Sequence, residues 1–134
     1  MAHWLLKTEP SEYAFPTLVK DGKTTWNGVT NNLALKYMRD MRKGDVAFIY
    51  HTGDERQIVG TAEVTSNPYP DPFLKDGKVV VIDLRPLETL AKPVTLAQIK
   101  DDPSFADFDL VRLGRLSVMP VSAERWKKLI DMAK

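Results

Sequence analysis

Apolar residues gather along the chain in short runs broken by turn-forming residues, and several of these runs predict β-strands. The first covers residues 3–8, where Lys7 and Thr8 follow an apolar stretch and Pro10 ends the strand. Four more are predicted at 46–52 (VAFIYHT), 57–66 (QIVGTAEVTS), 78–88 (KVVVIDLRPLE) and 115–121 (RLSVMPV). The second and third form a hairpin, in which Gly60 marks a bulge or a close approach.

Apolar residues at helical spacing predict short helices between these strands. The helices are expected in FPTLVKDG (15–22), from about Asn32 to Met41 with Asn31 or Asn32 as cap, from a Thr95–Gln98 capping box, and after a Ser122 cap. This irregular mixture does not fit a regular βαβ array. It predicts one α+β domain over residues 1–134, with five or six mostly antiparallel strands in a small barrel and short peripheral helices.

The amino-acid composition excludes several kinds of site. The chain contains no Cys, so disulfides and thiolate metal sites are excluded, and His3 and His51 are its only histidines. We therefore expect no metal and no cofactor. No signal peptide or apolar run long enough to span a membrane is present, so we expect a cytoplasmic protein with no membrane partner.

Charge is segregated, although the formal net charge is only +1. Residues 36–43 (KYMRDMRK) carry Lys36, Arg39, Arg42 and Lys43 against the single carboxylate of Asp40. Such a stretch is either a solvated helix face or a surface that binds phosphates, and the sequence leaves both interpretations open.

Trp26 lies in a polar, turn-rich stretch, TTWNGVTNN, without strand or helix periodicity. It is either a core residue or one wall of a pocket for a planar ligand, to which neighbouring amides would donate hydrogen bonds. Arg115 and Ser117 lie two apart and are expected on one side of a strand. Arg115 could bind a phosphate or pair with Glu9.

Six segments in order along the chain resemble the EVE domain, a family of the PUA-like superfold. They are HWLLKTEP, WNGVTN, GDVAFIYHT, IVGTAEV, YPDP and RLSVMPV. The resemblance implies a PUA-like pseudo-barrel that holds a modified base of a nucleic acid in an aromatic pocket, with modified cytosine the leading candidate.

Carried onto this chain, the resemblance places ligand-binding residues in several separate segments. They are Trp4, Lys7, Thr8, Glu9, Trp26, Asn31, His51, Thr52, Tyr69, Pro70, Asp71, Arg115, Leu116 and Ser117. Two positions depart from the family pattern, because Thr30 stands where relatives usually have Arg and Asn32 where they usually have an aromatic residue. A contact made by that Arg would be missing here, and the substrate could differ.

We therefore predict a non-enzymatic reader that takes one flipped or unpaired base of DNA or RNA from its nucleic-acid partner, with phosphates held by Lys36 to Lys43. The polar end of the first strand is expected to form a pocket wall, or else a rim in which Lys7, Glu9 and Arg115 pair. Lys7, Thr8 and Glu9 are also the residue types of small ASCH-type amidohydrolases, which would act on acylated nucleosides. Adjacent strand residues point to opposite faces, which argues against that enzyme. A protein-interaction module is a third possibility.

Overall fold

The structure is a computed structural model that describes residues 1–75 and 77–134. Its strands are β1 (His3–Thr8), β2 (Thr24–Trp26), β3 (Val46–His51), β4 (Gln57–Val64), β5 (Tyr69–Pro70), β6 (Val80–Thr95) and β7 (Val118–Val121). Its helices are α1 (Phe15–Asp21), α2 (Asn32–Asp40), α3 (Leu96–Lys100), the 3-10 turn η1 (Pro103–Phe105), α4 (Asp109–Arg112) and α5 (Ala123–Met132).

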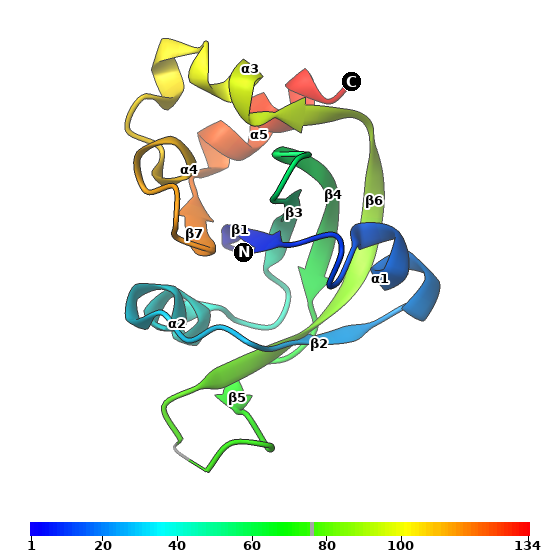
Figure 1. Ribbon diagram of the computed structural model, residues 1–134, viewed down its shortest axis with the longest axis vertical. Helices are drawn as coiled ribbons and strands as arrows, with labels where there is room; N and C mark the ends of the chain where they lie inside the picture. The colour runs from blue at the N-terminus through cyan, green and yellow to red at the C-terminus, as the bar shows by residue number, and fades with distance from the viewer. Residues whose placement is uncertain (76) are drawn as a thin grey trace.

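The strands form one curled, mixed sheet in the order β2-β6-β4-β3-β1-β7, with β5 paired to β6. β1 and β3 are parallel, and the other pairs within the described residues are antiparallel. Strand β6 runs nearly the whole length of the molecule, from the β5 hairpin at one end to α3 at the other (Figure 1). The predicted α+β fold of mostly antiparallel strands with short peripheral helices is confirmed, and the expected small barrel of five or six strands is, in the described part of the chain, a half-barrel of seven.

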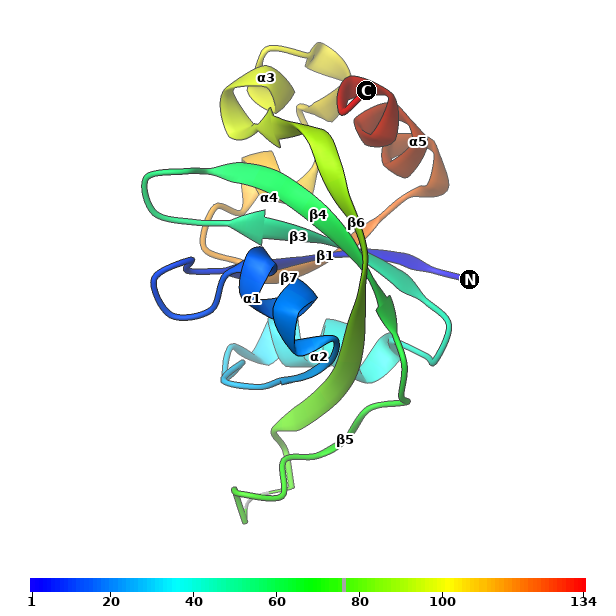
Figure 2. The same ribbon diagram turned by 90° about the vertical axis from the view of Figure 1, so that its right-hand side faces the viewer.

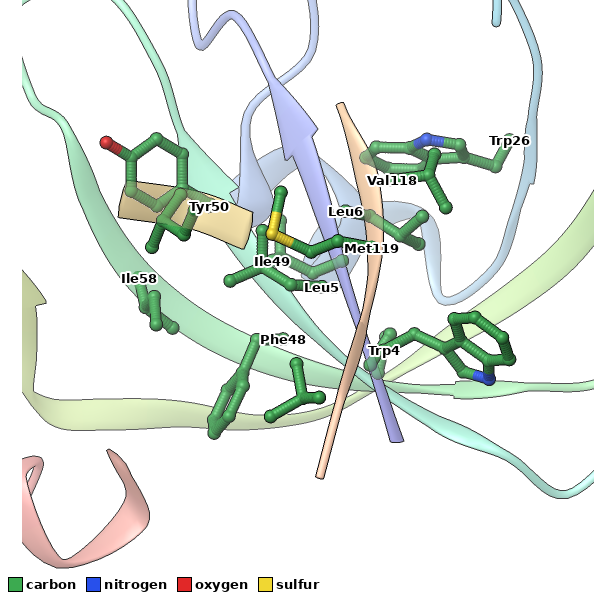
Figure 3. Close-up of a cluster of buried hydrophobic side chains, with 14 of the residues drawn as sticks. Trp4, Leu5, Leu6, Trp26, Phe48, Ile49, Tyr50, Ile58, Val118 and Met119 are labelled. Atoms are coloured by element: carbon green, nitrogen blue, oxygen red, sulfur yellow. The ribbon is translucent and has the colours of Figure 1, made fainter. Parts of the chain in front are cut away.

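Strand β1 lies inside the sheet and supplies the centre of the core. Leu5 and Leu6 are fully buried on its two faces. Figure 3 draws Leu5 toward Phe48 and Ile58, on the side of β1 opposite to Trp4 and Trp26. Both faces of β1 are therefore packed, which explains why its apolar residues are consecutive rather than strictly alternating.

The carboxylate of Asp45 joins three segments that are distant in sequence. Asp45 is 5% exposed and accepts hydrogen bonds from the backbone N–H of Ala2 (3.0 Å), the indole N–H of Trp4 (3.0 Å) and the backbone N–H of Arg42 (2.9 Å). These bonds connect the start of β1 to the segment between α2 and β3. Burial by itself would raise the pKa of Asp45, but the three donors outweigh it and hold that pKa below its usual range.

Gly60 lies where α1 packs most closely on the sheet. The pairing register of β4 shifts on both of its neighbours at this point, as expected for a bulge. A Cβ atom on Gly60 would lie only 2.3 Å from the ring of Phe15, which is buried at the start of α1. The predicted close approach is therefore confirmed, and only glycine fits it.

The largest differences in strand length from the prediction are at β6 and β7. β6 continues past Pro86, which faces Ala62 where the register shifts, so that its missing N–H falls at an irregular point of the ladder. The last predicted strand, expected from Arg115, begins only at Val118. A turn precedes it, in which the Leu116 N–H donates to the carbonyl of Leu113. The expectation that Arg115 and Ser117 share one face of a strand is therefore wrong.

Replacing Gly60 with Ala should lower the free energy of unfolding by about 1–3 kcal/mol, because the added methyl group overpacks a buried contact. Urea denaturation of the wild type and the variant measures this loss. Gly114→Ala is the matched control, since a Cβ there meets no atom within 4 Å. An equal loss in both variants would contradict the close approach at Gly60.

Replacing Asp45 with Asn should destabilise the protein by about 1–3 kcal/mol at pH 7, because an amide cannot accept all three hydrogen bonds. The pKa of Asp45 is lower in the folded state, so its contribution is complete above the unfolded pKa of about 4 and is lost as the pH falls through the folded value. The difference in stability from wild type should therefore shrink between pH 5 and about pH 3. Asp40→Asn, at an exposed site, is the control and should cost little stability at pH 7. A pH-independent gap for Asp45→Asn would contradict the assignment.

Candidate functional site

A cavity of about 660 Å³ opens where β1 ends. Figure 2 shows the end of β1 leading through a loop into α1. The cavity is lined by Lys7, Thr8, Glu9, Glu12, Tyr13, Thr24, Thr25, Trp26, Asn27, Gly28, Val29, Thr30, Asn31 and Ser117. Its volume is in the range of sites for small organic ligands, and most of its lining residues are polar.

Two aromatic side chains meet at this cavity. Trp26 is only 7% exposed and belongs to the core, and it also lines the cavity. The binding of a planar ligand by Trp26 stays a prediction. The ring of Tyr13 lies 6.4 Å from the indole at an interplanar angle of 80°. Together they form an aromatic corner, in which one ring faces the edge of the other.

Tyr13 was missed by the sequence analysis, and hydrogen bonds on both of its ends fix its position. The Thr8 hydroxyl donates to the Tyr13 carbonyl oxygen (2.7 Å), and the Tyr13 hydroxyl donates to Asp21 (3.2 Å). Burial and the Asp21 carboxylate raise the pKa of Tyr13. The available signal was an aromatic residue just before a predicted helix and close to the polar end of β1.

The Lys7 side chain lines the cavity and contacts Gly114 and Tyr50. Its ammonium donates to the carbonyl oxygen of Gly114 (2.9 Å) and lies 5.6 Å from the centre of the Tyr50 ring. Burial lowers the pKa of Lys7. One of its three N–H groups is used by Gly114, so the others are available to an acceptor in the cavity.

Glu9 points in a different direction. It accepts hydrogen bonds from the backbone N–H and hydroxyl of Ser11 (both 3.2 Å), and from the Thr52 hydroxyl at 3.4 Å. Within residues 1–75 and 77–134, no ion pair joins Lys7, Glu9 and Arg115. The three residues Lys7, Thr8 and Glu9 thus line one cavity without converging on one another, and a rim of paired charges is not observed among the described residues.

His51 and Thr52 do not line the cavity, and their hydrogen bonds hold neighbouring segments in place. His51 is buried, and its Nε2 accepts the backbone N–H of Phe15 (2.9 Å). Its Nδ1 therefore carries the proton and donates to Glu55 (3.0 Å), which holds the pKa of Glu55 below its usual range. These bonds fix the start of α1, and with it the loop that carries Tyr13.

Trp4 and the segment from Tyr69 to Asp71 also lie outside the cavity lining. Trp4 is held by Asp45 and packs 6.2 Å from the ring of Tyr37. The Tyr69 hydroxyl donates to Asp83 (2.6 Å), which raises the pKa of Tyr69. Asp83 also accepts from Thr25 in the cavity lining (3.0 Å), and the Tyr69 hydroxyl interacts with Thr25 as well, so Tyr69 adjoins the lining without being part of it. Pro70 is exposed on β5 and Asp71 is buried at the turn that follows.

Arg115 and Leu116 line a second cavity of about 360 Å³, next to the first. Asn31 lines both cavities, and its side chain also caps α2 by accepting the Ala34 N–H (3.0 Å). Ser117 stays with the first cavity. The structure thus divides the predicted Arg115–Ser117 segment between two neighbouring cavities.

The basic stretch follows α2 away from Asn31. Lys36, Arg39, Arg42 and Lys43 are all exposed, as predicted. Arg39 donates to the carbonyl of Lys78 (3.0 Å), and Arg42 donates to the carbonyls of Arg39 and Met41. Binding of phosphates by this surface stays a prediction.

The two family departures fall beside the first cavity. Thr30 lines it, whereas Asn32 is exposed at the first turn of α2. Gly28, in the same wall, has a φ of 80°, a backbone conformation that favours glycine. No group of three or more metal-ligating side chains occurs in the described part of the chain, and none of its helices is long and apolar enough to cross a membrane.

Comparisons with known proteins place this architecture in the class of PUA-like folds. The model of the EVE domain matches residues 2–132, and the chain belongs to that family. Thymocyte nuclear protein 1 of rat is 32% identical over 97% of this chain and 73% of the relative.

Solved structures agree with this placement. The structure of Rpa0253 from Rhodopseudomonas palustris is 43% identical, with a TM-score of 0.94 over 99% of this chain and 93% of that protein. The human THYN1 protein, solved in complex with DNA that contains 5-methylcytosine, is 23% identical, with a TM-score of 0.91 over 100% of this chain and 98% of that one. At that identity the second likeness shows the shared fold alone.

Proposed function

We propose that this chain is a non-enzymatic reader that binds one modified base of a nucleic acid in the cavity at the end of β1. The observation that carries the proposal is the aromatic corner of Trp26 and Tyr13 inside a cavity lined mostly by polar residues. A nucleobase offers a flat π-face and an edge of donors and acceptors, and this cavity has a counterpart for each.

The face of the base would stack on one aromatic ring of the corner while the other ring contacts its edge. Because Tyr13 is fixed at both ends and Trp26 is packed in the core, neither ring loses much conformational freedom when a base enters. Stacking of this kind contributes about 1–3 kcal/mol per base.

The polar edge of the base would meet side chains of both kinds. The ammonium of Lys7 donates to carbonyl or ring-nitrogen acceptors, and the carboxylates of Glu9 and Glu12 accept from an exocyclic amine. The amides of Asn27 and Asn31 can do either. Since cytosine combines an exocyclic amine with neighbouring acceptors, modified cytosine fits this lining and remains the leading candidate.

The base must leave a duplex, or be unpaired, to enter the cavity. Its backbone would then continue along α2, which starts at Asn31 beside the cavity and carries Lys36, Arg39, Arg42 and Lys43. The complex of human THYN1 with DNA containing 5-methylcytosine supports DNA as the first nucleic acid to test.

Trp26 variants test the stacking role. Trp26→Leu should weaken binding of 5-methyl-2′-deoxycytidine by about 1–3 kcal/mol, because it keeps apolar bulk without a π-face, whereas Trp26→Phe should retain part of the affinity. Isothermal titration with the free nucleoside measures the binding, and urea denaturation shows how much stability each variant keeps.

Trp126→Leu serves as the control, since Trp126 stacks on Phe48 (3.8 Å between ring centres) and does not line the cavity. It should lower stability and leave nucleoside affinity unchanged. Equal affinities of the Trp26→Leu and Trp26→Phe variants would contradict stacking. Release of carboxylate from an N4-acylated cytidine would contradict a non-enzymatic role.

The basic surface of α2 should contribute to oligonucleotide binding by neutralising phosphates. Lys36→Ala combined with Lys43→Ala should weaken binding of a single-stranded oligonucleotide and reduce the slope of log K against log salt by about 0.7 for each phosphate that is no longer neutralised. Binding of the free nucleoside should not change. The salt dependence of binding, followed by fluorescence anisotropy, is the measurement.

The matched control is Lys92→Ala combined with Lys127→Ala, which removes two exposed cations near the opposite end of the half-barrel. That variant should keep the wild-type salt slope. If the α2 variant also kept it, the stretch would be only a solvated helix face.

A further inference from the structure

The second cavity has a composition that the first lacks. Its lining combines the apolar side chains of Leu33, Leu113 and Leu116 with Asn31, Gly114 and Arg115. It therefore carries one positive charge and no negative charge, whereas the first cavity contains two glutamates. Leu33 is 38% exposed, so this apolar surface remains open to solvent.

Arg115 is the cation of this cavity. It is exposed, and its side chain makes no hydrogen bond or ion pair with any residue in 1–75 or 77–134. Other arginines near the surface are used within the fold, as Arg112 is by Asp109 (2.9 Å) and Arg125 by Asp107. All five N–H donors of Arg115 are thus available to a bound anion.

The two cavities are joined by shared parts of the protein. Asn31 lines both. Gly114, in the second cavity, accepts the hydrogen bond of the Lys7 ammonium, which lines the first. The neighbouring residues Leu116 and Ser117 lie one in each lining. The second cavity thus adjoins the first, and its own lining holds no acidic side chain.

From this arrangement we infer that the second cavity is a subsite for the nucleotide adjacent to the base held in the first. The apolar leucines would cover one face of the neighbouring base, and the Arg115 guanidinium would bind the phosphate that links the two nucleotides. This inference rests on the proposed function and adds to it a minimal ligand, a dinucleotide.

The subsite should be tolerant of base identity. The polar side chains of the lining are Asn31, which is shared with the first cavity and whose Oδ1 already accepts the Ala34 N–H, and Arg115, which would be occupied by the phosphate. Burial of a flat apolar face on leucine depends on area and not on donor and acceptor pattern. Recognition of the modification would remain with the first cavity.

The experiment compares a series of probes by isothermal titration. They are 5-methyl-2′-deoxycytidine, its 3′- and 5′-monophosphates, and the two dinucleotides in which thymidine follows or precedes it. One of the two dinucleotides should bind at least about tenfold more tightly than the nucleoside, with the corresponding monophosphate in between, because a charge-assisted hydrogen bond and an apolar contact are added in turn.

Variants at exposed positions show which residues cause the tighter binding of the monophosphate and the dinucleotide. Arg115→Ala should remove about a tenfold advantage from both the monophosphate and the dinucleotide, while Leu33→Ser should weaken the dinucleotide only. Neither should change the affinity for the nucleoside. Lys127→Ala, which removes an exposed cation from α5, should change none of the affinities.

The outcomes separate this inference from the proposed function. If the nucleoside binds but neither dinucleotide binds more tightly, or if Arg115→Ala weakens the nucleoside as much as the dinucleotide, the subsite is overturned and the reader function stands. If no probe binds, both are overturned. A gain that persists in the Arg115 and Leu33 variants would place the second nucleotide elsewhere and also overturn the subsite.

Discussion

The buried carboxylate of Asp45 is the constraint on which the rest of the structure depends. Because β1 and β3 are parallel, no hairpin turn can align them, and their register must come from contacts between distant segments. Asp45 supplies these contacts by binding Ala2 and Trp4 at the start of β1 and Arg42 before β3. The opposite end of β1 carries Lys7 and Thr8 into the cavity, so an anchor at one end of the strand positions the site at the other.

Several of the site residues expected from the family resemblance do not line the cavity, because they hold the segments that do. His51 binds the Phe15 N–H, and Phe15 in turn fills the space left by Gly60. The start of α1 is thereby held, and the Thr8 hydroxyl fixes the carbonyl of Tyr13 in the loop before it. The motif residues Trp4 and His51 thus hold in place the segments that carry the cavity lining. Much of the cavity surface itself is made by side chains between the motifs.

Sequence patterns predicted the fold well because local rules decide most of its elements. The Thr95–Gln98 capping box, the Ser122 cap and the apolar stripe of α2 all formed where they were expected. Tyr13 and the turn at residues 113–117 escaped prediction because they depend on tertiary contacts, a carbonyl held by Thr8 in one case and the Lys7–Gly114 bond in the other. The same holds for η1 and α4, whose buried Phe105 and Leu110 lie in a stretch that is rich in Asp.

Thr30 stands where relatives usually have arginine, and this change determines which residues near the cavity can supply positive charge. Thr30 lines the first cavity, so an arginine at this position would place a cation beside Glu9 and Glu12, where a phosphate would also have to approach. With Thr30 in its place, the cation in that lining is Lys7, which is already hydrogen-bonded to Gly114. Arg115, whose guanidinium has no partner among the described residues, is the cation in the lining of the adjoining cavity, and we propose that it binds the phosphate there. This distribution of cations agrees with the proposal that the first cavity takes the base and the second takes part of its backbone.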